Sequence, residues 1–104
     1  MNQPVNNPYF LSLDLEMNQN SGKIIQIGAV AGNLKTGKVH EKISVLVKIP
    51  EPLNPFITTL TSITDEMLET QGVSLIEAYQ LLKLFHLRNK CLTNPITWGG
   101  GDSR

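Results

Sequence analysis

Residues 9–17, YFLSLDLEM, alternate apolar and polar side chains from Leu11 onward with a period of two, which is the spacing of a β-strand. In such a strand the three leucines share one face, whereas Asp14 and Glu16 share the other. The strand contains no Lys or Arg to neutralise these carboxylates. Because two like charges held this close repel each other unless a cation lies between them, the pair predicts a divalent metal ion on this face.

Two more strands are expected after the first. Residues 23–34, KIIQIGAVAGNL, are apolar almost throughout, which predicts a strand buried on both faces. A turn at Gly37 leads into residues 38–49, where apolar and polar side chains mostly alternate. We expect this third strand to have one solvated face and to lie at or near an edge of the sheet.

The second half of the chain has helical signals after the segment PEPLNP interrupts the strand pattern. Thr64 is suited to cap a short helix over residues 65–71, which has two acidic residues in its first turn. Ser74 and Glu77 form a capping box ahead of a second helix, whose apolar residues recur at helical spacing. The last ten residues, PITWGGGDSR, predict a short fourth strand followed by a glycine run.

Net charge, apolar content and cysteine count limit the kinds of function that the chain can have. Nine basic and nine acidic residues cancel, so no net field attracts a polyanion or a membrane surface. No stretch approaches the roughly 20 apolar residues of a membrane span, and the polar start lacks the regions of a signal peptide. The single Cys91 excludes an internal disulfide and fits a reducing compartment. We therefore expect a cytoplasmic protein with a polar leader over residues 1–8 and one domain over residues 9–104.

Three segments resemble motifs of one enzyme family. FLSLDLEM followed by GKIIQIGAV looks like the first motif of the 3′–5′ exonucleases with four catalytic acids, the DEDDh type, which includes proofreading exonucleases and oligoribonucleases. LTSITDEML resembles the element between that family's first two motifs. WGGGDSR resembles the second motif, in which an Asp follows a strand and starts a helix. Since D-x-E alone is common by chance, the resemblance depends on all three segments in this order.

The resemblance implies an α/β, ribonuclease H-like fold in which a mixed sheet is flanked by helices, with the C-terminal part of the fold missing. It implies that Asp14, Glu16 and Asp102 are the catalytic residues and metal ligands, and that they converge at one end of the sheet. The implied cofactor is a pair of Mg²⁺ or Mn²⁺ ions, since oxygen-only ligands suit these metals. The implied substrate-binding residues are Met17, Thr61 and Thr64.

The sequence departs from the family pattern at the third motif, where a His acts as general base and an Asp follows five residues later. Neither His40 nor His86 is followed by an Asp at that distance. We therefore expect the chain to be the N-terminal part of a longer exonuclease and to be inactive, or nearly so, by itself. Met17 and Asn18 also stand where many members carry small hydroxyl residues, and Ser62 stands where a Gly is usual.

The leading hypothesis is a metal-dependent 3′–5′ exonuclease that releases nucleoside monophosphates from the 3′ end of single-stranded DNA or RNA. One alternative is a noncatalytic nucleic-acid-binding module of the same fold. Another is a homo-oligomer that associates through an exposed sheet edge. Structural roles are also open for several residues, because Asp102 and Thr64 are natural helix caps and Trp98 suits a core.

Overall fold

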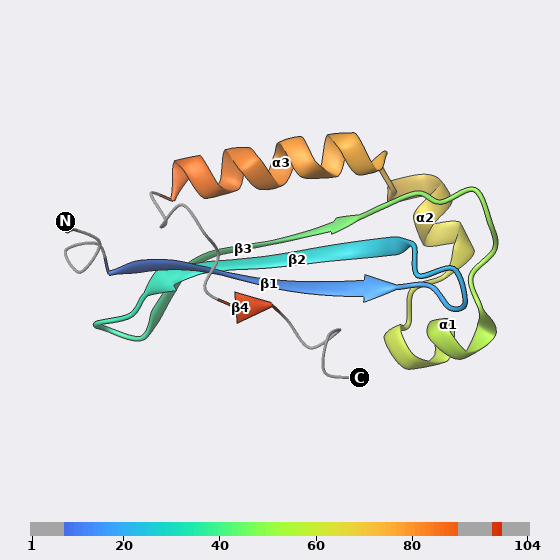
Figure 1. Cartoon of the computed structure of the whole chain (residues 1–104), viewed down its shortest axis with the longest axis horizontal. Coiled ribbons are helices and arrows are strands. Elements are labelled where there is room, and N and C mark those ends of the chain that lie inside the picture. The colour runs from blue at the N-terminus through green and yellow to red at the C-terminus, as the bar shows by residue number, and fades with distance from the viewer. Residues whose placement is uncertain (1–7, 90–96, 99–104) are drawn as a thin grey trace.

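The computed structural model describes residues 8–89 and 97–98 of the chain. Its elements are, in order, β1 (Tyr9–Met17), β2 (Ile24–Asn33), β3 (Lys38–Leu46), α1 (Pro55–Thr61), α2 (Asp65–Gln71), α3 (Leu75–Arg88) and β4 (Thr97–Trp98). The strands form one sheet in the order β3-β2-β1-β4 (Figure 1). Strand β1 pairs antiparallel with β2 and parallel with β4, so the sheet is mixed, and β3 lies at an edge as its alternating sequence predicts.

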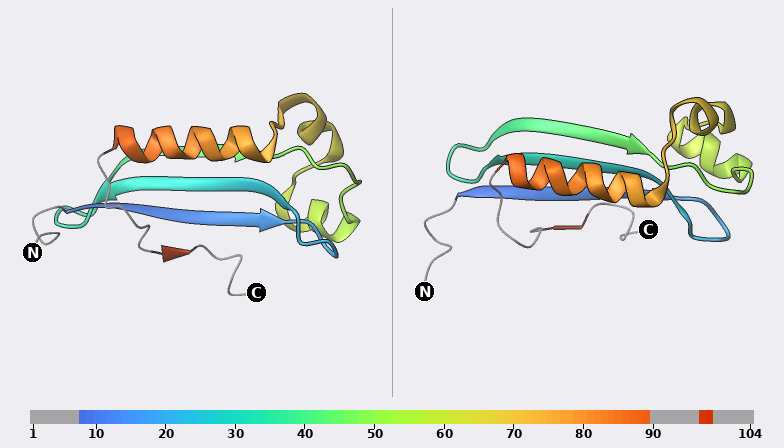
Figure 2. Two further views of the ribbon diagram at one scale, coloured as in Figure 1. Left: turned by 45° about the horizontal axis from the view of Figure 1, so that its top comes forward. Right: turned by 90° about the horizontal axis from the view of Figure 1, so that it is seen from above.

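The helices cover one face and one end of the sheet. Helix α3 crosses the face made by alternate residues of β1 and β2, where Leu11, Leu13 and Phe85 form part of a buried cluster. Helices α1 and α2 lie together beyond the end of β1 (Figure 1; Figure 2 shows two further views). There, Ile57 and Leu68 pack with Ile25 of β2 in a second buried cluster. The face opposite α3 stays open within the described residues, and it carries the acidic side chains of β1.

Two helix starts agree with the sequence patterns. Helix α2 spans the predicted residues, and the Thr64 Oγ1 at its N-terminus accepts a hydrogen bond from the backbone N of Met67 at 3.1 Å. At the start of α3, Ser74 Oγ accepts from the backbone N of Glu77, also at 3.1 Å. Each hydroxyl satisfies a donor that the first helical turn leaves without a backbone partner. No helix among the described residues is both long and apolar enough to span a membrane.

Two strand predictions differ from the structure. Strand β3 ends at Leu46 rather than at residue 49, because the chain there begins to pair with the segment before α3: the backbone N of Val73 donates to Leu46 O at 2.9 Å, and Lys48 N donates to Val73 O at 2.8 Å. Strand β2 is buried on one face only in the described part of the chain, since its burial alternates along the strand. Its second face is half-buried, because no described helix covers it.

Helix α1 was not predicted, although its start has a recognisable signal. Asn54 is the N-cap, and its Oδ1 accepts from the backbone N of Phe56 at 2.8 Å. Pro55 opens the helix, where its missing N–H needs no partner. The helix is followed by its C-cap residue Ser62, whose φ of 68° lies in the left-handed region. That conformation favours glycine, which is the residue that the family resemblance places at this position.

Candidate active site

Asp14 and Glu16 project from β1 on the sheet face opposite α3. Asp14 is exposed and Glu16 is half-buried. Asp14 lies across from Gly28 of β2, so no side chain of β2 stands directly beside it. The hollow next to Asp14 has a volume of about 400 Å³ and is bounded on its far side by Lys42 and Ser44 of β3. The acid pair is therefore open to a ligand that approaches this face.

The two carboxylates have the properties of metal ligands. Within residues 8–89, neither side chain forms a hydrogen bond or an ion pair. Their oxygen atoms are available, and oxygen donors of this kind fit a hard divalent cation such as Mg²⁺. The described residues contain no group of three His, Cys, Asp or Glu side chains that could hold a metal together. Asp102, the third predicted ligand, lies outside the described residues, as do residues 1–7 of the predicted leader.

A second pocket, of about 530 Å³, adjoins Glu16. One wall is formed by the end of β1 and the turn that follows it, and the other by Ile57 and Leu60 of α1. Met17, which the resemblance assigns to substrate binding, lines the pocket beside Glu16 and is 37% exposed. The volume lies within the range of small-molecule sites. A carboxylate, apolar side chains and side-chain amides thus meet in one cavity.

Thr61 and Thr64 do not line this pocket. The Oγ1 of Thr61 donates to the backbone O of Ile57 at 2.8 Å and accepts from the backbone N of Ile63 at 3.1 Å. The hydroxyl of Thr64 caps α2, as described above. Both hydroxyl groups therefore stabilise the junction between α1 and α2, and their contacts with a substrate stay predictions.

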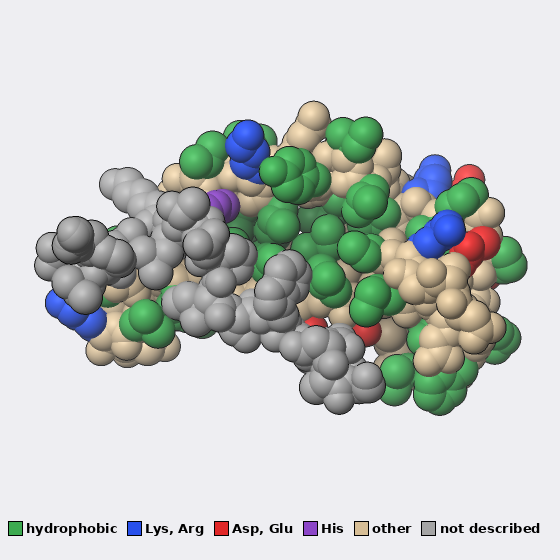
Figure 3. Space-filling view, in the orientation of Figure 1, with side chains coloured by type: hydrophobic (Ala, Val, Ile, Leu, Met, Phe, Trp, Pro, Cys, Tyr) green, Lys and Arg blue, Asp and Glu red, His purple; other side chains and the backbone are tan. Residues whose placement is uncertain are grey.

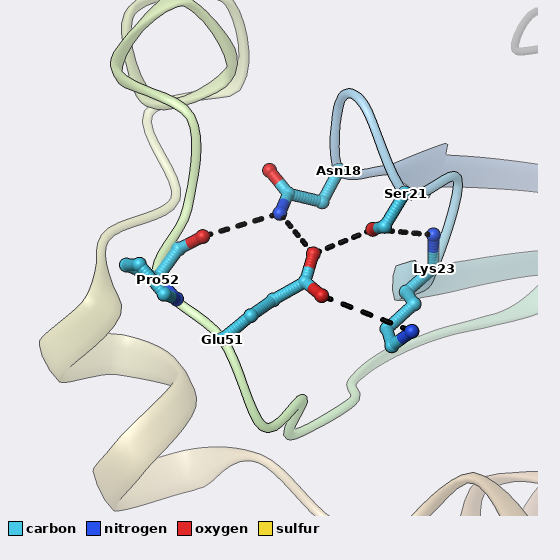
Figure 4. Close-up of polar contacts among 5 residues, drawn as sticks. All are labelled: Asn18, Ser21, Lys23, Glu51 and Pro52. Carbon is cyan, nitrogen blue, oxygen red and sulfur yellow. Dashed lines mark hydrogen bonds and ion pairs between the residues drawn. The ribbon is translucent and has the colours of Figure 1, made fainter.

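A hydrogen-bond network joins the turn after β1, which forms one wall of the pocket, to the segment that leads into α1 (Figure 4). Its centre is Asn18, a polar residue that is only 2% exposed. The Asn18 Nδ2 donates to Glu51 Oε2 at 2.7 Å and to the backbone O of Pro52 at 3.2 Å. The Asn18 Oδ1 accepts from the backbone N of Asn54 at 2.9 Å. One side chain thus ties the turn after β1 to the segment that leads into α1.

Glu51 receives further contacts from the same turn. The Ser21 hydroxyl donates to Glu51 Oε2, and the Nζ of Lys23 lies 3.8 Å from Glu51 Oε1. The hydrogen bonds from Ser21 and Asn18, together with the charge of Lys23, hold the pKa of the Glu51 carboxyl below its ordinary value. Sequence patterns do not reveal this network, because Asn18 and Glu51 are 33 residues apart and belong to no shared periodicity.

Comparison with known proteins identifies the family. The model of the exonuclease family RNase_T matches residues 11–95, which is most of the chain. A comparison with curated protein sequences gave no match.

Solved nuclease structures have the same fold. The nuclease domain of 3′hExo, described as a DEDDh family member bound to rAMP, has a TM-score of 0.71 at 17% identity, over 90% of this chain and 52% of that one. A full-length 3′-exonuclease has a TM-score of 0.62 at 21% identity, over 78% of this chain and 40% of that one. Exonuclease X in complex with 5′ overhanging duplex DNA has a TM-score of 0.61 at 19% identity, over 86% and 57%.

These matches confirm the predicted α/β, ribonuclease H-like fold. The chain spans between 40% and 57% of the length of the three solved proteins, and it corresponds to the N-terminal portion of the fold. Because their sequence identity is low, these structures support the fold alone, whereas the family model matches residues 11–95, which include Asp14 and Glu16 but not Asp102. The chain therefore belongs to the RNase_T exonuclease family.

Proposed function

We propose that this chain is the metal-binding and nucleotide-binding part of a 3′–5′ exonuclease that releases nucleoside monophosphates from single-stranded DNA or RNA. The observation that carries the proposal is the acid pair of β1. Asp14 and Glu16 share an open face, no described residue neutralises them, and a pocket of ligand size adjoins Glu16. Membership of the exonuclease family supplies the reaction class, which is hydrolysis of a phosphodiester.

Asp14 and Glu16 are the proposed metal ligands among the described residues, and Asp102 is the proposed third. Strand β4 runs parallel to β1 beside Ser12 and Leu13, so the carboxyl ends of both strands point to the same end of the sheet. This direction supports a place for Asp102 near the acid pair. We propose Mg²⁺ or Mn²⁺, because all three ligands are carboxylates. A pair of such ions, when bound, activates the attacking water and stabilises the leaving oxygen.

The terminal nucleotide is proposed to bind in the pocket beside Glu16. Met17 and Leu60 offer apolar surface to a base, and the amide side chains of the turn after β1 offer donors and acceptors. One of the solved relatives is bound to rAMP and another to duplex DNA, which supports a nucleic-acid ligand for this fold. We propose single-stranded DNA or RNA here and a cytoplasmic setting, both of which stay predictions.

Low activity of the 104-residue chain is also part of the proposal. His40 lies edge-on to Tyr9 at the start of β1, with ring centroids 5.3 Å apart. His86 lines the groove between α3 and the leucines of β1, on the other face of the sheet from Asp14. Within the described ranges, therefore, no imidazole lies on the face of the acid pair, where a general base would deprotonate water.

A second candidate function is a noncatalytic or self-associating module of the same fold. One observation favours self-association: six large apolar side chains of α3 are exposed, and Figure 3 shows hydrophobic side chains gathered over α3 and between α3 and β1. Surface patches of this kind are commonly covered by another protein segment. These side chains are Leu75, Ile76, Tyr79, Leu81, Leu84 and Leu87. Association through an exposed edge of the sheet, where β3 and β4 are the outer strands, is the other form of this proposal.

Metal binding by Asp14 tests the proposed site. We expect Mn²⁺ to broaden the NMR signals of residues around Asp14 and Glu16 in the wild-type chain. Asp14→Asn keeps the shape of the side chain but removes its charge, so it should abolish this broadening. Glu69→Gln, an exposed charge change on α2, is the matched control and should bind Mn²⁺ like the wild type. Equal broadening in the wild type and Asp14→Asn would contradict the site.

The direction of hydrolysis is tested with a single-stranded oligonucleotide that carries a fluorescent label at its 5′ end. A 3′–5′ exonuclease shortens this substrate progressively and yields a ladder of labelled products. Immediate release of a labelled mononucleotide would instead indicate attack from the 5′ end and would contradict the proposed direction.

A further inference from the structure

We infer that Asn18 is a positioning residue that, through Glu51 and Asn54, sets the shape of the pocket beside Glu16 and hence the affinity of the chain for a nucleotide. The inference rests on the proposed function, since it names a residue that governs the same pocket. It concerns a residue that the family pattern does not supply, because a small hydroxyl residue is usual at this position.

Asn18 links one wall of the pocket to the segment that leads into the helix forming the other wall. On the side of the turn, the backbone N of Asn18 donates to Lys23 O, and the backbone N of Gly22 donates to Asn18 O, both at 2.8 Å. On the opposite side, the Asn18 side chain contacts the Glu51 carboxylate and the backbone of Pro52 and Asn54, in the segment just before α1. This buried side chain therefore contributes to the position of one wall relative to the other, together with the contacts of Ser21 and Lys23 to Glu51.

Asn54 connects Asn18 to the start of α1. Its backbone N donates to Asn18 Oδ1 at 2.9 Å, while its own side chain caps α1 by accepting from Phe56 N at 2.8 Å. The first turns of α1 then supply Ile57 and Leu60 to the pocket. We therefore expect a change at Asn18 to shift the helix that forms the apolar wall, although Asn18 lies on the other wall.

The amide group is needed because it donates and accepts at once. Its Nδ2 satisfies the Glu51 carboxylate and the Pro52 carbonyl, and its Oδ1 satisfies the backbone N of Asn54. Alanine at this buried position would remove this partner from the Pro52 carbonyl and the Asn54 N–H and would leave Glu51 with its contacts to Ser21 and Lys23 only. An Asp would set a second carboxylate against two acceptors. A threonine hydroxyl, with one donor hydrogen, would not reproduce both donated bonds.

Glu41 provides a matched control at the other end of the sheet. Like Glu51, it is a carboxylate that contacts both a cation and an Asn amide: Arg88 Nη2 lies 2.6 Å from Glu41 Oε2, and Asn89 Nδ2 donates to Glu41 Oε1 at 3.0 Å. This contact joins β3 to the end of α3, and none of its residues lines the pocket beside Glu16. Loss of the Glu41 contact removes comparable bonds without affecting either wall.

The test measures AMP binding to the Mn²⁺-loaded full chain by calorimetry, with Mn²⁺ binding measured separately. We expect Asn18→Ala and Glu51→Ala each to weaken AMP binding about tenfold, since misplaced walls lose contacts worth that factor. Both variants should leave Mn²⁺ binding unchanged. Glu51→Gln keeps an acceptor for Asn18 and should restore AMP binding, whereas Glu41→Ala should bind AMP like the wild type.

The outcomes separate the inference from the proposed function. Wild-type AMP affinity in Asn18→Ala, or equal losses in Glu41→Ala and Glu51→Ala, would overturn the role of Asn18 and leave the proposed function standing. A wild-type chain that binds neither Mn²⁺ nor AMP would overturn the proposed function and the inference with it. Asn18 is buried, so its substitution can impair folding. If Asn18→Ala does not fold, the comparison of Glu51→Ala with Glu51→Gln tests the inference instead. Equal AMP affinity in these two would contradict the inference.

Discussion

Asp14 of β1 lies directly across the antiparallel register from Gly28 of β2, so the first acid of the pair has no neighbouring side chain on that strand. A methyl group at Gly28 would lie 3.7 Å from the backbone O of Asp14 and 3.9 Å from its Cβ, which are ordinary van der Waals contacts. An alanine therefore fits at this position, whereas a longer side chain would extend over the hollow beside Asp14.

This relationship predicts opposite results for two substitutions of Gly28. Gly28→Leu should weaken Mn²⁺ binding at Asp14 and Glu16, because its side chain occupies the approach to the carboxylates. Gly28→Ala should bind Mn²⁺ like the wild type. Manganese titrations followed by NMR line broadening measure both, and circular dichroism checks that both variants are folded. Undiminished broadening in folded Gly28→Leu would show that the metal approaches from elsewhere.

The conformation of Ser62 predicts a stabilising substitution. A non-glycine residue in the left-handed region costs about 1–2 kcal/mol, and Ser62 has a φ of 68°. Ser62→Gly removes this cost but adds flexibility to the unfolded chain, so we expect a net gain of about 0.5–1 kcal/mol in the free energy of unfolding. Urea denaturation measures the gain. Ser62→Ala keeps the strain and is the control; a stability gain in Ala equal to that in Gly would contradict the explanation.

The sequence predicts the elements whose signals are local. Alternation along residues 11–17 predicts β1 and the shared face of its two acids, and the hydroxyl caps at Thr64 and Ser74 predict where two helices begin. Each of these signals lies within a few residues of the structure that it specifies. Helix α1 was missed because Asn54 and Pro55, which start it, also read as the end of a strand.

Features that depend on distant residues could not be predicted. The network of Asn18 and Glu51 forms only when α1 folds back against the turn after β1, and the early end of β3 depends on Val73. The half-buried second face of β2 also depends on distant residues. The apolar composition of a strand indicates how much surface it can bury, but not which element covers that surface. Thus the acid pair was predictable from sequence, whereas the pocket beside it was not.

The lowered pKa of Glu51 predicts a pH dependence of stability. Because the folded-state pKa lies below the ordinary value of 4.5, the ionised carboxylate stabilises the fold above that pH, and this contribution is lost as the pH falls through the folded-state pKa. Glu51→Gln should therefore remove part of the fall in unfolding free energy below pH 4.5. Urea denaturation across acidic pH measures this. The pKa of Glu41 is also lowered, so the unfolding free energy of the double variant Glu41→Gln/Glu51→Gln should depend least on pH in the acidic range. An unchanged fall of the unfolding free energy at acidic pH in Glu51→Gln would contradict the assignment.

The absence of an imidazole on the face of the acid pair, within the described residues, predicts that a general base must come from elsewhere. Positioned general bases typically contribute about 10²–10⁴-fold to the rate of a hydrolytic step. We expect a longer version of the chain that includes a His-x-x-x-x-Asp segment to exceed the 104-residue chain by about this factor in Mn²⁺-dependent cleavage of a single-stranded oligonucleotide. In the longer version, Asp102→Ala should abolish the gain, whereas His40→Gln, a change away from the acid pair, should retain it.

Full-rate, Asp102-dependent cleavage by the 104-residue chain would show that no further base is required. An inactive longer chain with an intact segment would instead favour the noncatalytic binding module.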